Sequence, residues 1–135
     1  MTRDAFRELV EEALDTIPEH FRDAMQNIAI VIEDAPTREQ LDEVDVAPPD
    51  TLLGLYQGTP LPERQWAQGN MLPDKITLFQ HSIEEASIDE DDVVVAVGET
   101  LIHEIGHYFG LSEEEIEEIE ERYWHARGGD ASKDA

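Results

Sequence analysis

The segment 89–110, DEDDVVVAVGETLIHEIGHYFG, constrains the fold more than any other part of this sequence. Its apolar residues recur at the three- and four-residue spacing of an α-helix from Val93 to Phe109. The acidic residues before Val93 suit the positive end of a helix dipole, and Gly110 supplies a stop, because glycine readily adopts the positive φ that ends many helices. We therefore predict a long, largely buried helix, which the rest of a 135-residue chain has to cover.

Two histidines lie four residues apart on this predicted helix. At that spacing His103 and His107 project from one face about a turn apart, so both imidazoles can reach one cation. Without a partner, each buried imidazole would cost roughly 1 to 3 kcal/mol. Glu104 lies on the adjacent flank, where its carboxylate can reach a metal-bound water rather than the metal. The pattern H-E-x-x-H therefore predicts a zinc site of the metallopeptidase type.

A third protein ligand is expected from the residues after the glycine. Ser112 and Glu115 have the spacing of a capping box, which predicts a further helix over residues 113–127. Glu113, at its first position, is the nearest acid to the histidines, and we expect the helix to carry later glutamates away from the metal. Acids in a first helical turn also complement the helix dipole without any metal. The other candidates are Glu114, Glu117, Glu120, Glu121, His125 and water.

The segment HEIGHYFGLSE resembles the metzincin pattern H-E-x-x-H-x-x-G-x-x-H, with Glu113 where the last histidine stands. More closely, TLIHEIGHYFGLSEEE in a short, acidic chain resembles the small bacterial zincin-like metallopeptidases, sometimes called minimal zincins, in which an acidic residue commonly takes that position. The methionines of this chain all precede the motif, so the methionine turn of metzincins is missing. The resemblance implies that His103, His107 and Glu113 bind one catalytic zinc ion and that Glu104 is the catalytic carboxylate.

The remaining sequence predicts a small α+β domain. Apolar spacing indicates an N-terminal helix over residues 3–17, and the following proline starts a short helix over residues 18–25. Thr37 and Gln40 predict a capped helical turn. Segments rich in β-branched residues predict three strands, the last two forming an open hairpin: residues 27–34, 51–58 and 75–81. With the resemblance, this order predicts a minimal zincin-like fold, in which a small mixed three-stranded sheet packs on the N-terminal helix and the buried H-E-x-x-H helix, followed by a C-terminal helix.

Domain limits and a substrate path follow from the same patterns. We expect residues 1–127 to form a single zincin-like metallopeptidase domain and residues 128–135, GGDASKDA, to be a disordered tail. The predicted strand at 75–81 is our expected edge for an extended substrate, with the loop from Thr59 to Asp74 as a cleft wall. His81 is expected to be a surface residue at the end of that strand.

Charge and composition exclude some kinds of binding partner and metal ligand. The chain carries 9 Lys+Arg against 33 Asp+Glu, a net charge of −24, which repels phosphate backbones and argues against nucleic-acid binding. There is no cysteine, so a zinc site has to use His, Asp or Glu. The N-terminal segment lacks the apolar core of a signal peptide, and no segment reaches the length of a membrane span. We therefore expect a cytoplasmic protein without a membrane partner, and a monomer by default.

These features predict a zinc metalloendopeptidase that acts on a peptide or protein substrate. In the expected mechanism Glu104 takes a proton from a zinc-bound water, which then attacks a peptide carbonyl. The alternative is a zinc-containing binding or regulatory module without proteolytic activity. Glu104 discriminates the two, because a structural zinc site needs three or four ligands but no additional carboxylate beside an open position.

Overall fold

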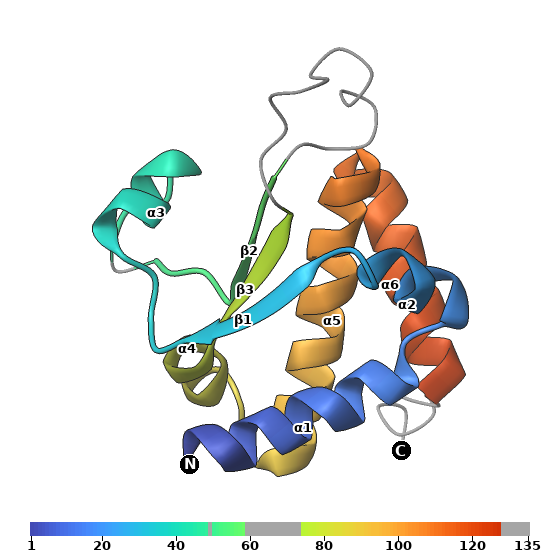
Figure 1. Cartoon of the computed structure of the whole chain (residues 1–135), viewed down its shortest axis with the longest axis horizontal. Helices are drawn as coiled ribbons and strands as arrows, with labels where there is room; N and C mark the ends of the chain where they lie inside the picture. The colour runs from blue at the N-terminus through green and yellow to red at the C-terminus, as the bar shows by residue number, and fades with distance from the viewer. Residues whose placement is uncertain (49, 59–73, 128–135) are drawn as a thin grey trace.

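The computed structural model describes residues 1–48, 50–58 and 74–127 (Figure 1). Its elements are α1 (Arg3–Thr16), α2 (Glu19–Met25), β1 (Ala29–Glu33), α3 (Arg38–Glu43), β2 (Gly54–Gln57), β3 (Lys75–Phe79), α4 (Gln80–Glu85), α5 (Glu90–Phe109) and α6 (Glu113–Arg127). This is the predicted α+β order with one added helix, α4. The predicted disordered tail, and all but the last residue of the predicted cleft wall, lie outside the described residues.

The three strands form one mixed sheet with the order β1-β3-β2. β1 runs parallel to β3, with Ile30 opposite Ile76, and β2 runs antiparallel to β3, with Tyr56 opposite Ile76. The predicted hairpin of β2 and β3 is therefore confirmed, and α3 and β2 lie within the connection that parallel pairing requires. Because β3 is central and paired on both sides, the expectation that its edge receives a substrate is wrong. Within the described residues, β2 is the edge strand on that side.

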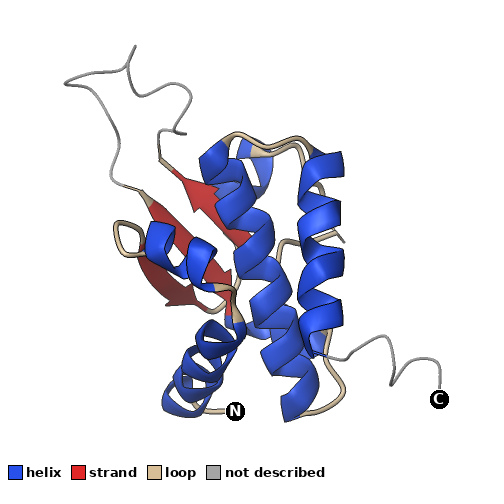
Figure 2. Cartoon of the chain, turned by 90° about the vertical axis from the view of Figure 1, so that its right-hand side faces the viewer, coloured by secondary structure: helices blue, strands red, loops and turns tan. Residues whose placement is uncertain are grey.

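The core forms around α5, as expected for a largely buried helix. Figure 2 shows α5 between the sheet and α6, and α1 packs against α5 from another direction (Figure 1). The buried side chains that meet here are Phe6, Val10 and Ala13 of α1, Ile76 and Leu78 of β3, and Val97, Leu101, Ile102 and Ile105 of α5. Each large aliphatic or aromatic side chain buried in this way contributes roughly 1.5 to 3 kcal/mol. No helix in the described part of the chain is both long and apolar enough to span a membrane.

The chain leaves the sheet earlier than the sequence predicts. β3 ends at Phe79, and Gln80 begins α4 instead of continuing a strand to residue 81. The buried Gln80 side chain accepts a hydrogen bond from Arg3 Nε at 2.7 Å and donates one to the Met1 carbonyl at 3.0 Å. These contacts with the start of the chain have no local sequence signal. His81 is a surface residue, as expected, but it lies on α4 and pairs with Glu85 at 2.6 Å.

Candidate metal centre

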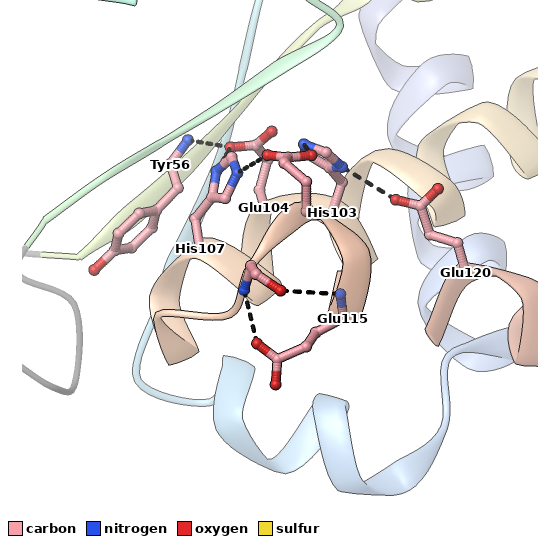
Figure 3. Close-up of polar contacts among 8 residues, drawn as sticks. Tyr56, His103, Glu104, His107, Glu115 and Glu120 are labelled. Carbon is pink, nitrogen blue, oxygen red and sulfur yellow. Dashed lines mark hydrogen bonds and ion pairs between the residues drawn. The ribbon is translucent and has the colours of Figure 1, made fainter. Parts of the chain in front are cut away.

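The motif residues of α5 lie together on one side of the helix (Figure 3). One ligand atom from each of His103, Glu104 and His107 lies within 4.8 Å of the others. The two imidazole rings are 4.8 Å apart between centroids and are inclined by 76° to each other. The histidine side chains are 35% and 39% exposed, whereas Glu104 is buried. Both imidazoles are thus accessible from solvent beside a shielded carboxylate.

The turn after α5 has the predicted form. Gly110 ends the helix in the left-handed conformation with a φ of 74°, and its N–H donates to carbonyls of the last turn. Ser112 then donates its backbone N–H to the Glu115 carboxylate at 2.9 Å, and Glu115 donates its own N–H to the Ser112 hydroxyl at 3.2 Å. The backbone hydrogen bond from Ser112 holds the pKa of Glu115 below its usual value. Glu115 is therefore the cap partner of α6.

Glu113 faces both histidines from the first turn of α6. One of its carboxylate oxygens lies 3.4 Å from Nε2 of His107, and the other lies 3.8 Å from Nε2 of His103. The Glu113 carboxylate thus lies close to the Nε2 atoms of both histidines. This donor set fits zinc, which takes His and Glu ligands and, in catalytic sites, leaves a fourth position open.

Glu120 lies on the other side of the His103 ring, 3.1 Å from Nδ1 (Figure 3). Our expectation that α6 carries every later glutamate away from the site is wrong for this residue. The helix runs back antiparallel beside α5, so Glu113 lies near His107 while Glu120 lies near His103. The other candidate acids of α6 are exposed: Glu114, Glu117 and Glu121. The side chain of His125 lies outside the described residues.

Glu104 is held by a backbone group that the sequence did not reveal. The N–H of Tyr56 on β2 donates to Glu104 Oε1 at 2.9 Å, and the same oxygen lies 3.2 Å from Nδ1 of His107 (Figure 3). The hydrogen bond with Glu104 raises the pKa of His107 above its usual 6.5; burial opposes this effect, and Glu113 adds to it. The edge strand therefore fixes the carboxylate next to the candidate ligands.

A close approach of β2 to α5 makes that contact possible. A Cβ added at Gly54 would lie 2.5 Å from Thr100 Cγ2 and 3.1 Å from the Thr77 carbonyl oxygen, so only glycine leaves room here. Beside this contact is a cleft of about 300 Å³. It is lined by the start of β2 and the residues before it, by α5 and by α6: Thr51, Leu52, Leu53, Gly54, Glu99, Thr100, His103, Glu104 and Glu120. The candidate metal centre thus opens onto the edge of the sheet.

Comparison with known proteins agrees with this geometry. The family described as zincin-like metallopeptidase matches residues 25–123, which include the sheet, the whole of α5 and most of α6. No curated protein matches the chain. The family match covers well over half of the sequence and includes every residue of the candidate metal centre. This chain therefore belongs to the family of zincin-like metallopeptidases.

Proposed function

We propose that the protein is a zinc-dependent endopeptidase. His103, His107 and Glu113 would hold the metal through the two Nε2 atoms and a carboxylate oxygen. The observation that carries the proposal is Glu104, a buried carboxylate that Tyr56 N–H holds at 2.9 Å and that the ligand set does not require. A structural zinc site needs three or four ligands, and Glu104 is a further, shielded carboxylate beside the three proposed ones.

Glu104 is the proposed general base and acid. Bound zinc would supply Lewis acidity, which lowers the pKa of a coordinated water and polarises a carbonyl. Glu104 would accept a proton from the attacking water and deliver it to the amine that leaves. The hydrogen bond from Tyr56 N–H holds this carboxylate beside the proposed ligands. The position of Glu104 is thus fixed before any substrate binds.

The outer edge of β2 is the proposed substrate platform, in place of β3. Phe79 N–H donates to the Leu53 carbonyl, whereas Tyr56 N–H points away from β3 to Glu104. Because backbone groups alternate along an antiparallel strand, those of Gly54 also face outward. An extended peptide could pair along this edge, which adjoins the cleft, with its backbone running past Glu104. Binding along a strand edge is independent of chain ends and supports internal cleavage.

The proposal also includes the expected domain limits and the expected location in the cell. Residues 1–127 would act as one domain, because α1, the sheet and α6 all pack on α5. A cytoplasmic location is supported by the sequence pattern alone.

The proposal can be tested by identifying the products that the protein forms from a long, unfolded protein substrate. We expect mass spectrometry to identify internal cleavage sites after incubation with the zinc-loaded protein and none after treatment with a chelator. Removal of residues only from chain ends would indicate an exopeptidase. If the zinc-loaded protein cleaves nothing in a broad set of substrates, the proposed endopeptidase is wrong and the zinc-containing binding or regulatory module takes its place.

A further inference from the structure

We infer that Glu120 is a positioning residue, which orients His103 for the metal without binding the metal itself. The inference rests on the proposed function, because it assigns Nε2 of His103 to zinc. Its basis is the contact between Glu120 Oε1 and His103 Nδ1 at 3.1 Å. The H-E-x-x-H motif does not include this residue.

The two ring nitrogens of His103 face different acids. Nε2 lies 3.8 Å from Glu113, on the side where the candidate ligands converge, whereas Nδ1 lies 3.1 Å from Glu120. An ionised carboxylate only accepts hydrogen bonds, so Glu120 favours the neutral tautomer with its proton on Nδ1. That tautomer leaves the Nε2 lone pair for the metal. A carboxylate on the opposite nitrogen of a metal-binding histidine is a common way to fix the ring.

The position of Glu120 also argues against a role as the third ligand. A third ligand has to lie near the Nε2 atoms of both histidines, and Glu113 does so. Glu120 approaches only His103, from the Nδ1 side. Its side chain is 25% exposed, compared with 71% for Glu113, so its hydrogen bond is better shielded from water.

The packing of α6 on α5 fixes this contact. A Cβ at Gly106 would lie 2.6 Å from Ile116 Cγ1, so the fully buried Ile116 sits directly against the glycine. Glu113, Ile116 and Glu120 follow the i, i+3, i+7 spacing that places residues on one helix face. This close contact therefore holds the helix face that carries both acids against α5.

His107 provides an internal comparison. Its Nδ1 faces Glu104 at 3.2 Å, so the proposed catalytic acid also orients the second histidine. Glu120 makes the orientation of His103 independent of Glu104. Variants of Glu120 should accordingly affect His103 and leave the environment of His107 unchanged.

The test compares Glu120→Gln and Glu120→Leu with matched control variants at exposed Glu117, Glu117→Gln and Glu117→Leu. Affinity for Zn²⁺ alone is measured by competition with a chromophoric chelator. We expect Glu120→Leu to bind Zn²⁺ roughly 10- to 100-fold more weakly than wild type, the usual effect of losing such a partner. Glu120→Gln keeps a hydrogen-bond acceptor and should retain most of the affinity. Both control variants should match wild type.

A second readout needs neither metal nor activity. Long-range ¹H–¹⁵N NMR spectra of the metal-free protein at alkaline pH report which nitrogen of each neutral histidine carries the proton. We expect His103 to be protonated at Nδ1 in wild type and in Glu120→Gln, with a shift toward the Nε2 tautomer in Glu120→Leu. The tautomer of His107 should not change.

The outcomes separate the inference from the proposed function. Wild-type Zn²⁺ affinity and an unchanged His103 tautomer in Glu120→Leu would overturn the role of Glu120 and leave the peptidase proposal intact. Equal losses in Glu120→Gln and Glu120→Leu, with the tautomer unchanged, would show a charge effect and would also overturn it. If wild type fails to bind Zn²⁺, the proposed function fails, and the NMR result alone decides whether Glu120 sets the tautomer.

Discussion

Ile116 of α6 lies directly on Gly106 of α5, where an added Cβ would come within 2.6 Å of Cγ1 and 2.8 Å of Cδ1. This contact brings the two helices together between the pair His107–Glu113 and the pair His103–Glu120. The element that packs against Gly106 is α6. The candidate metal centre therefore depends on the packing of α6 against α5 between these two pairs.

Substitution of Gly106 tests this dependence. Gly106→Ala should destabilise the protein by about 1 to 3 kcal/mol, because the β-branched side chain of Ile116 cannot move aside easily. Ile116→Ala should cost about 2 to 5 kcal/mol through the cavity that it leaves. Denaturant unfolding of the double variant should show less than the sum of the two losses, since the alanine methyl at 106 fills part of that cavity. Fully additive losses would contradict the proposed contact.

Glu113→Ala should remove a zinc ligand and leave the fold intact, because the side chain is 71% exposed. Zn²⁺ affinity should fall by more than the roughly 10- to 100-fold expected for loss of an outer-shell partner. Glu114→Ala is the matched control, since it removes the neighbouring exposed acid and should have no effect. The assignment is wrong if both variants bind Zn²⁺ with wild-type stoichiometry and affinity.

The raised pKa of His107 predicts how zinc binding depends on pH. The folded, metal-free protein holds this proton more tightly than the unfolded chain does. The resulting stabilisation is complete below the ordinary value of 6.5 and is lost as the pH rises through the raised pKa. Zinc competes with the same proton, so Zn²⁺ affinity should rise over that interval.

Glu104→Gln removes the largest cause of the raised pKa of His107. The pH curve of Zn²⁺ affinity should therefore move to lower pH in this variant, as measured by chelator competition across the titration of histidine. Glu115→Gln, whose side chain caps α6 instead, is the control and should leave the curve unchanged. A curve that does not move in Glu104→Gln would show that Glu104 does not control the protonation of His107.

Gly54 offers a test of the contact between Tyr56 and Glu104. Gly54→Val should push β2 away from α5, because its Cβ would lie 2.5 Å from Thr100 Cγ2. We expect Zn²⁺ binding to persist while peptide cleavage falls, since the metal ligands lie on α5 and α6 but the support of Glu104 comes from β2. Gly54→Ala combined with Thr100→Ala should recover activity relative to Gly54→Ala alone. Loss of Zn²⁺ binding in parallel with activity would argue against separate roles for the strand and the helices.

Local patterns predicted those parts of the site that depend on neighbouring residues. The spacing of His103 and His107, the left-handed Gly110 and the Ser112–Glu115 capping box are consequences of helix geometry within one segment. The position of Glu120 was mispredicted because it depends on the antiparallel packing of α6, which a single-helix argument does not include. The loop from 59 to 73 falls outside the described residues.

Local patterns also failed to predict the order of the strands in the sheet. Hydrophobic patterns identified all three strands, yet they did not reveal that β3 is central or that β2 provides the edge. Strand order is decided by long-range pairing, here the parallel contact of β1 with β3 across α3 and β2. The hydrogen bond from Tyr56 N–H to Glu104 is a backbone contact between distant segments and leaves no signature in residue type.

The most direct test of the central claim compares wild type with Glu104→Gln at equal, measured zinc content. Gln keeps the size of the side chain but cannot accept and return a proton as the carboxylate does. We predict zinc stoichiometry unchanged and the rate of peptide cleavage lowered by about 10²- to 10⁴-fold, the range typical of a lost general base. Cleavage by Glu104→Gln at the wild-type rate would contradict the assignment of Glu104 as the catalytic carboxylate.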